Sequence, residues 1–179
     1  MTSLLTPRLL TPRLTLRRWR EDDVEPMAAI HADPEVMRWI GDGSVRDRDQ
    51  TAAGIAGWER DWEEWGLGLF AVELRESRQL AGFAGLSVPG FLPEILPAVE
   101  IGWRFGRPYW GQGLATEAAR AVLDFALRER GLARVVSIST VGNDASEQIM
   151  RKLGMRLERE TRNPVYGTRV RVHVLELRP

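Results

Sequence analysis

The chain has 179 residues, no cysteine, and 25 basic against 25 acidic residues, so its formal net charge is zero. This length suits one domain with its own core, and the lack of cysteine excludes thiolate nucleophiles, disulfides and cysteine-ligated metal sites. The balanced charge argues against nucleic acid or an anionic membrane as partner, and no apolar run approaches the ~20 residues of a membrane span. We expect a cytoplasmic protein with one domain over residues 1–179 and no metal site.

The chain opens with a repeated segment, a strand and an interrupted helix. LLTPR occurs at 4–8 and again at 9–13, and its prolines limit helix formation. We therefore expect residues 1–12 to form a loosely ordered N-terminal extension. Residues 13–18 alternate between apolar and polar side chains and predict a short strand, and residues 20–40 predict a helix broken by a proline near its middle.

A tryptophan-rich helix is predicted over residues 47–65. Trp58, Trp62 and Trp65 recur at helical spacing and share a face. Such a stripe is typical of a core helix, although it can also line a binding surface. The period then changes to two, which predicts a β-hairpin over residues 67–88.

The strand predicted over residues 98–105 has the clearest alternation in the chain. Its large apolar side chains fall on one face, and Glu100, Gly102 and Arg104 fall on the other. Glu100 is therefore expected to point away from the large apolar side chains.

The remaining elements alternate between helix and strand. Residues 114–131 predict a helix with a stripe of small apolar side chains, and residues 143–154 a short helix. Strands are predicted over 133–141 and 169–176, with one more near 156–161. The order predicts a mixed α/β domain of the α+β type, in which a central mixed sheet of about six to seven strands is flanked by about four helices.

A glycine-rich turn over residues 106–116 joins a predicted strand to a predicted helix. Such a turn presents backbone N–H groups at the positive end of the helix dipole, where phosphate binds readily. A tight turn that only allows close helix–sheet packing would also explain the glycines. A P-loop is excluded because Lys152 is the only lysine. The dinucleotide fingerprint fits poorly, since Thr116 stands where it requires a third glycine or alanine.

Two segments carry a family resemblance. "EIGWRFGRPYWGQGLATEAARAVLDFAL" and "VVSISTVGNDASEQIMRKLGM" resemble the GNAT superfamily of acyl-CoA-dependent N-acyltransferases. Within it they resemble the RimJ/RimL-like branch, which acetylates protein N-terminal amines. The resemblance extends from "TPRLTLRRWREDDVEPMAAIHADPEVMRWI" to the final strand, so it covers nearly the whole chain and implies the GNAT fold.

The resemblance implies that acetyl-CoA, or CoA, is the cofactor. Backbone amides of the glycine turn would bind its pyrophosphate, and the strand before the turn would pair with its pantetheine arm. Trp110 stands where the superfamily has glutamine or arginine, although "YWGQG" is usual for the branch. The cofactor residues so implied are Trp103, Phe105, Trp110, Gly111, Gln112, Gly113, Leu114, Ala115 and Thr116.

A second motif supports the same reading. Asn143, Ser146, Lys152 and Gly154 match the branch pattern of Asn, two residues, Ser, then Lys-x-Gly. In the family this helix holds the pantetheine and the thioester. Taken alone, Asn143 and Ser146 are ordinary helix-start residues.

Two groups are the predicted catalytic residues. Many superfamily members carry a tyrosine acid where this chain has Met150, so Ser146 is the substitute that the branch pattern implies, donating a hydrogen bond to the departing sulfur. Glu100 is the candidate base, acting directly or through a water, because it begins the strand expected to carry the cofactor. Glu100 could instead be a surface or salt-bridged carboxylate.

The acceptor side gives weaker signals. Trp39, Trp58 and Trp62 could wall an acceptor site, because the family's first two helices border it. His173 shares a strand face with Arg169 and Arg171, which favours a solvated position, and His31 lies in the first helical region.

The leading hypothesis is acetyl-CoA-dependent transfer of an acetyl group to a primary amine by direct attack on the thioester. A protein or peptide α-amine is favoured, because its pKa of about 7.7–8.0 means that it loses its proton near neutral pH with little help from the enzyme. Alternatives are a small-molecule amine (an antibiotic, a polyamine or an amino acid), a CoA-binding sensor without catalysis, and a turn that binds no cofactor. The amine acceptor is the expected partner, and the chain is expected to be a monomer or homodimer.

Overall fold

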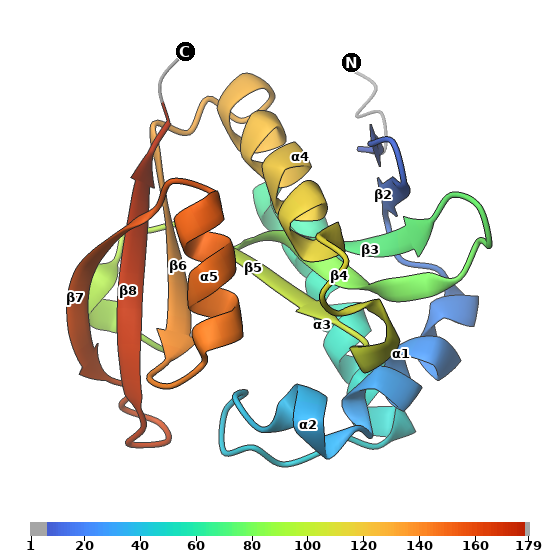
Figure 1. The fold of residues 1–179 in the computed structure, drawn as a ribbon, viewed down its shortest axis with the longest axis horizontal. Helices are drawn as coiled ribbons and strands as arrows, with labels where there is room; N and C mark the ends of the chain where they lie inside the picture. Colours follow the sequence, from blue (N-terminus) through green and yellow to red (C-terminus); the bar gives the residue numbers. More distant parts are fainter. Residues whose placement is uncertain (1–6, 178–179) are drawn as a thin grey trace.

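A single mixed sheet organises the protein. The computed structural model describes residues 7–177, and within them it contains eight strands and five α-helices (Figure 1). The strands are β1 (Leu9–Leu10), β2 (Leu14–Arg17), β3 (Leu69–Leu74), β4 (Leu80–Ser87), β5 (Glu100–Phe105), β6 (Arg134–Thr140), β7 (Arg156–Arg162) and β8 (Arg169–Glu176). The helices are α1 (Val24–His31), α2 (Pro34–Met37), α3 (Arg48–Trp65), α4 (Leu114–Arg128) and α5 (Asp144–Lys152).

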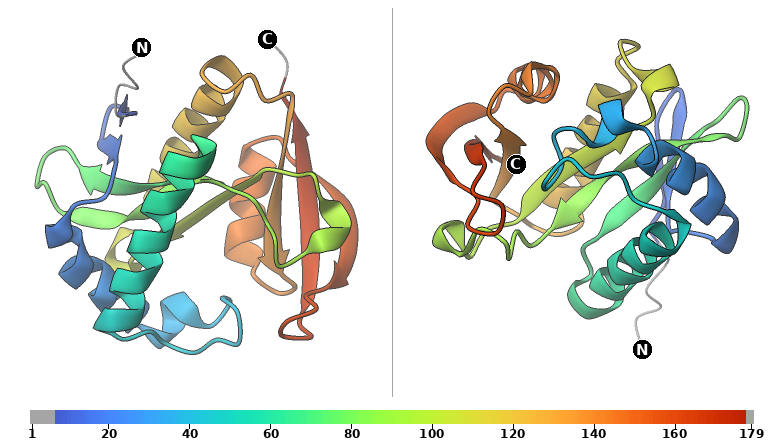
Figure 2. Two further views of the ribbon diagram at one scale, coloured as in Figure 1. Left: turned by 180° about the vertical axis from the view of Figure 1, so that it is seen from behind. Right: turned by 90° about the horizontal axis from the view of Figure 1, so that it is seen from below.

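The sheet order explains where the helices lie. Across the sheet the strands run β1-β2-β3-β4-β5-β6-β8-β7. All neighbours are antiparallel except β5 and β6, which are parallel and joined through α4. Helices α4 and α5 cover one side of the sheet, and the view from behind shows α3 crossing the other side (Figures 1 and 2).

The helix α4 lies close to the sheet because its inner face is small. Ala118, Ala119, Val122 and Ala126 are fully buried in the main core cluster, together with Phe125. Alanine at successive inner positions lets the helix backbone approach the strands while still removing apolar surface from water.

A buried ion network joins β2 to β3 and to the segment before α1. The Arg17 guanidinium donates to both carboxylate oxygens of Asp23, at 2.7 and 2.8 Å, and to Glu73 at 3.0 Å. All three side chains are almost fully buried. Glu73 also pairs with Arg78 at 2.9 Å, so the charge on each carboxylate is compensated.

The fold class predicted from the sequence is confirmed, with two additions. The predicted strand near residues 156–161 is present as β7, and the first helical region breaks before Pro34 as expected. The strand count rises to eight in the described part of the chain because residues 9–10 pair with β2. The expectation of a loose extension therefore fails for residues 9–12, where Thr11 donates a hydrogen bond to Glu117 at 2.6 Å. Residues 1–6 lie outside the described residues.

The expectation that His173 is solvated is wrong. Only 6% of His173 is exposed, because β8 is flanked by β6 and β7 and its face is covered by α5. Glu147 of α5 accepts two hydrogen bonds from Arg171 at 3.0 and 3.1 Å across this layer. Burial lowers the pKa of His173.

The lengths and compositions of the helices show whether any of them could span a membrane. Among residues 7–177, none of the helices combines the length and apolar character that crossing a bilayer requires.

Replacing Arg17 with methionine should lower the free energy of unfolding by about 3 kcal/mol, because it leaves the buried Asp23 carboxylate without its cation. This value is at the lower end of the usual loss for a broken buried ion pair, because Glu73 still has Arg78 as an ion-pair partner. Urea denaturation measures the change. The control is Arg48→Met, whose partner Glu25 is at the surface, and it should show no measurable loss. Equal losses in the two variants would contradict the prediction.

Candidate active site

Strands β5 and β6 meet at one position and then separate. Glu100 pairs with Val136, and the Val136 amide donates to the Val99 carbonyl at 2.9 Å. Among the described residues no further pair joins the two strands. The β6-facing edge of β5 is therefore open beyond Glu100. Backbone N–H and C=O groups require partners, so an extended ligand can bind along this edge.

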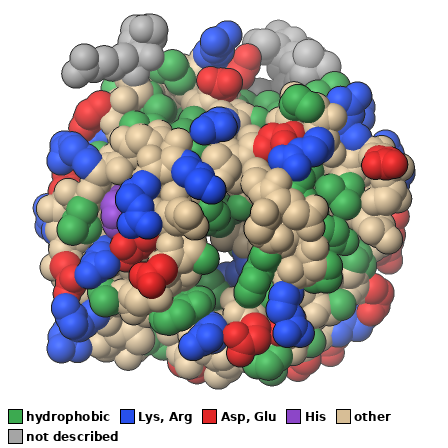
Figure 3. Space-filling model, viewed as in Figure 1, with side chains coloured by type: hydrophobic (Ala, Val, Ile, Leu, Met, Phe, Trp, Pro, Cys, Tyr) green, Lys and Arg blue, Asp and Glu red, His purple; other side chains and the backbone are tan. Residues whose placement is uncertain are grey.

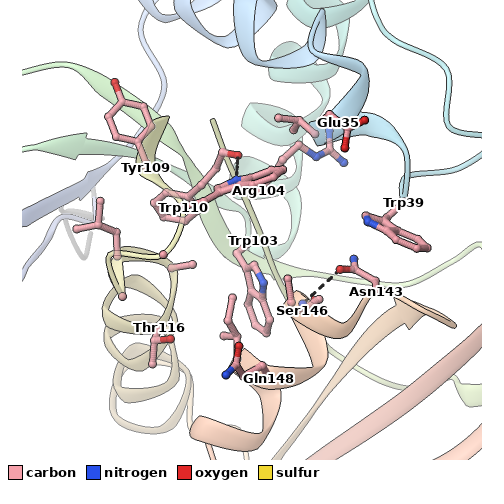
Figure 4. Close-up of a pocket in the computed structure, with 18 of the residues that line it drawn as sticks. Glu35, Trp39, Trp103, Arg104, Tyr109, Trp110, Thr116, Asn143, Ser146 and Gln148 are labelled. Carbon is pink, nitrogen blue, oxygen red and sulfur yellow. Dashed lines mark hydrogen bonds between the residues drawn. The ribbon is translucent and has the colours of Figure 1, made fainter. Parts of the chain in front are cut away.

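A cavity of about 350 Å³ lies where the strands separate. Its lining comes from β5, from α2 and the residues that follow it, from the glycine turn with the first turn of α4, and from α5. Figure 3 shows a hollow near the middle of this face, bordered by hydrophobic side chains. In Figure 4 the indole of Trp103 extends from β5 toward α5, where Ser146 lies.

The glycine turn presents unpartnered amides to this cavity. Gly111 and Gly113 have φ of +72° and +76°, in the left-handed region that favours glycine. Gly113 is the N-cap of α4, and no side chain caps the helix there. Among the described residues, the amides of residues 111–116 find no acceptor. A Cβ at Gly111 would meet no atom within 4 Å, so the space above the turn is open to a ligand.

The connection between β1 and β2 supports the glycine turn. Arg13 donates to the Gln112 carbonyl at 2.9 Å and pairs with Glu117 at 2.7 Å. Thr11 donates to the same carboxylate at 2.6 Å. These contacts fix the first turn of α4, so its free amides keep one orientation.

The helix α5 forms the opposite wall. Asn143 caps it by accepting a hydrogen bond from the Ser146 amide at 3.3 Å (Figure 4). Ser146 lines the cavity and is half-buried, whereas Met150 is fully buried on the sheet side of the helix. Met150 therefore offers no proton donor to the cavity.

Trp39 closes one end of the cavity. Its carbonyl accepts a hydrogen bond from the Thr140 hydroxyl at 3.0 Å, and its ring lies beside Gly142. The Arg38 guanidinium lies 4.8 Å from the centre of the same ring. The segment after α2 is thereby fastened to the end of β6.

A family comparison decides what this arrangement is. The family model described as an acetyltransferase (GNAT) domain matches residues 13–156. The chain belongs to the GNAT acetyltransferase family. This GNAT chain is 31% identical over 156 residues to YkkB of Bacillus subtilis (strain 168), an uncharacterized protein, and the match covers 87% of this chain and 88% of YkkB.

Solved structures agree on the GNAT fold. An acetyltransferase from Agrobacterium tumefaciens str. C58 is similar with a TM-score of 0.81 at 24% identity, covering 99% of this chain and 98% of that one. RimL, the ribosomal L7/L12 α-N-protein acetyltransferase, solved in complex with CoA, is similar with a TM-score of 0.78 at 15% identity, covering 96% and 98%. The GNAT chain is an acetyltransferase, and its cofactor is acetyl-CoA.

Most cofactor residues predicted from the sequence line this cavity of the GNAT chain. Gln112 is outside it, because its side chain turns back to donate to the Pro108 carbonyl at 2.8 Å. The predicted residues that do line the cavity are Trp39, Trp103, Phe105, Trp110, Gly111, Gly113, Leu114, Ala115, Thr116, Asn143 and Ser146.

Glu100 lies at the point where β5 and β6 meet, beside the cavity and outside its lining. Burial raises the pKa of its carboxyl from 4.5 to about 8, although the backbone amide of Ile138 acts in the opposite direction. The carboxyl forms no ion pair among the described residues. Its environment therefore differs from that of a surface or salt-bridged carboxylate.

The structure corrects two acceptor-site predictions. Trp62 is 5% exposed and packs in the core against Phe70 and Phe125, donating to the Leu69 carbonyl at 3.1 Å. Trp58 packs against other aromatic rings on the α3 side of the sheet and is absent from the cavity lining. Both serve the core because α3 lies flat on β3 and β4.

Sequence reasoning missed Arg104 as a site residue. Arg104 lines the cavity, and its Nη1 lies 2.8 Å from Nε2 of His31. The only sequence signal was its place on the same strand face as Glu100. Its partner His31 comes from α1, and no local pattern joins segments so far apart in the chain.

Replacing Gly111 with alanine should cost about 1–2 kcal/mol of unfolding free energy through backbone strain alone, since its Cβ meets no atom within 4 Å. The control is Gly90→Ala, which also has nothing within 4 Å but lacks a left-handed φ. Thermal and urea denaturation of both variants measure the difference. If Gly111→Ala were as stable as Gly90→Ala, the turn would not require glycine for its conformation.

Proposed function

We propose that this GNAT chain transfers the acetyl group of acetyl-CoA to the α-amine of a protein or peptide N-terminus. The observation that carries the proposal is the row of unpartnered amides over residues 111–116. All of these residues except Gln112 line the same cavity as α5 and the open edge of β5. An anionic group at one end and an extended chain along the strand edge would satisfy these backbone groups together.

The residues present fit the cofactor. The amides of Gly111 to Thr116 would hold the pyrophosphate at the positive end of the α4 dipole. The edge of β5 before Phe105 would pair with the amides of the pantetheine arm. Asn143 and Ser146 would lie beside the thioester, whose acetyl carbon the bound cofactor supplies to the amine.

Glu100 supports an α-amine as the acceptor. Its pKa of about 8 matches an α-amine at about 7.7–8.0, so a proton moves between them at almost no cost. A lysine side chain at about 10.4 would lose its proton to the same base at a cost of about 3 kcal/mol. The pKa of Glu100 therefore matches the less basic of the two amines, the α-amine.

The reaction balances without another reactant. The amine nitrogen bonds to the acetyl carbon, the bond from that carbon to sulfur breaks, and Glu100 accepts the amine proton, directly or through a water. Ser146 would donate a hydrogen bond to the departing sulfur. A thiol of pKa about 8.5 leaves readily, so this hydrogen bond assists the departure and is not essential to it.

Release of free thiol from acetyl-CoA, with short peptides as acceptors, tests the function. Glu100→Gln should lower kcat/KM about 10²–10⁴-fold near pH 8, where a large fraction of the Glu100 carboxyl is ionised and can accept the amine proton. At pH 7 most of this carboxyl is protonated, so the loss should be smaller there. The control is the exposed Glu64→Gln, which should retain wild-type activity.

Two outcomes would overturn the assignment. Turnover of small amines only, such as polyamines or aminoglycosides, would replace the peptide acceptor with a small molecule. If no amine reacts but CoA at ~100 times its Kd stabilises the fold by about 2.7 kcal/mol, the chain is a CoA-binding sensor. If CoA gives no stabilisation, the turn binds no cofactor.

The raised pKa of Glu100 also predicts how stability depends on pH. Between about 4.5 and 8 the folded carboxyl holds a proton that the unfolded chain releases, so this group's stabilisation is complete below 4.5 and is lost as pH rises through 8. Glu100→Gln should remove this part of the decline. Urea denaturation from pH 4.5 to 9 measures it, and parallel curves for wild type and variant would contradict the shifted pKa.

A further inference from the structure

Arg104 is a partly buried cation without a compensating carboxylate. Its guanidinium lies 5.1 Å from the centre of the Phe83 ring and lines the cavity. Among residues 7–177 it forms no ion pair, its Nε is buried without a partner, and its Nη2 makes no hydrogen bond. A cation in such a position is costly unless an anion joins it.

The partner that Arg104 does have leaves its charge intact. His31 is fully buried, its Nδ1 lies 2.9 Å from the Thr51 hydroxyl, and its Nε2 faces Arg104. Burial, with the charges of Arg104 and Arg46, lowers the pKa of His31 to about 3, so the imidazole is neutral. His31 therefore accepts a hydrogen bond from Arg104 and fixes the guanidinium without neutralising it.

A second cation strengthens the positive potential. Arg46 donates its backbone amide to the His31 carbonyl at 3.1 Å, and it has no ion-pair partner in the described part of the chain. Burial and the charge of Arg46 lower the pKa of Arg104 to about 9, so Arg104 still carries its charge at pH 7. The nearby acids do not pair with Arg104: Glu35, which lines the cavity, pairs with Arg38, and Asp42 interacts with Arg46.

The strand face between Arg104 and Glu100 carries no side chain. Gly102 lies between them in β5 and is paired with Gly85 of β4. A Cβ at Gly102 would meet nothing within 4 Å. We call the bare strip of β5 at Gly102 the glycine floor; Gly85 beside it has no such space, because a Cβ there would collide with the Gly68 carbonyl oxygen. The glycine floor separates Glu100 from Arg104 by about 13 Å along the strand backbone. The Glu100 carboxyl accepts a hydrogen bond from the Ile138 amide of β6, and the Arg104 guanidinium lies beside Phe83 and His31.

We propose that the acceptor amine also carries a carboxylate, which binds Arg104 while the amine lies over the glycine floor toward Glu100. The inference rests on the proposed function, since it names the class of amine that the same site takes. Arginine is the side chain best suited to carboxylate recognition, and fixing it in advance by His31 reduces the entropy lost on binding. The carboxylate can belong to a free amino acid or to an acidic first residue of a peptide.

The first experiment compares acceptors that differ only in that charge. One arm uses peptides that begin with Asp or Glu against matched peptides that begin with Asn or Gln, and the other uses free amino acids against their carboxamides. Arg104→Met should lower kcat/KM about 10–100-fold for the carboxylate member of a pair and less than threefold for the neutral member. The arm that shows the difference identifies the source of the carboxylate.

A matched control separates charge recognition from loss of structure. Arg130 is also stacked on a phenylalanine, 4.7 Å from the Phe125 ring, with a buried Nε that lacks a partner, and it lies outside the cavity. Arg130→Met should leave the preference for carboxylates unchanged. Equal losses for acidic and neutral acceptors with Arg104→Met, or a weakened affinity for CoA, would show that Arg104 is structural and overturn the proposal.

A second variant tests the glycine floor. Gly102→Val adds a side chain into open space, so we expect a folded protein with unchanged CoA affinity and a loss of at least tenfold in kcat/KM for every acceptor. Unchanged kcat/KM would show that the acceptor does not cross this strip.

A binding measurement keeps the inference separate from the proposed function. Calorimetric titration of the CoA-loaded protein with an N-acetyl amino acid and with its carboxamide requires no turnover. Tighter binding of the carboxylate that disappears in Arg104→Met supports the inference even if no thiol is released. Equal binding of the two compounds contradicts it even if peptides are acetylated.

Discussion

The separation of β5 from β6 after a single residue pair is the constraint on which the rest of the structure depends. An open strand edge inside a domain leaves backbone groups that neither side chains nor a neighbouring strand satisfy. The surrounding elements keep that edge open: α4 and α5 lie on one side of it, and Trp39 fastens the segment after α2 to the end of β6. The opening of the site is therefore created by the path of the strands, and the side chains determine only its lining.

Arginine has two opposite uses in this protein. Arg17 sits between two buried carboxylates, and its charge is fully compensated, so it serves stability. Arg104 is held by a neutral imidazole, and its charge is left available. The difference lies in the partner, because a carboxylate neutralises the guanidinium whereas a buried histidine with a low pKa only orients it.

Local sequence signals predicted the parts of the structure that depend on local geometry. The period of apolar side chains located the strands and helices, and the glycines at 111 and 113 marked a turn whose φ values are positive. Packing between distant segments was not readable. Trp62 and His173 were misplaced because the elements that cover them, β3 and α4 for Trp62 and α5 for His173, come from other parts of the chain. The contact between His31 and Arg104 could not be predicted from the sequence for the same reason.

The glycine floor has a consequence for how such a protein can diversify. The proposed donor contacts use backbone amides, which only a substitution by proline removes, whereas the strip over Gly102 has free space that any added side chain would fill. Under the proposed function, a single mutation there changes the shape offered to the amine and leaves the acetyl donor's contacts as they are. Related chains can therefore acquire new acceptors one residue at a time while inheriting the same chemistry.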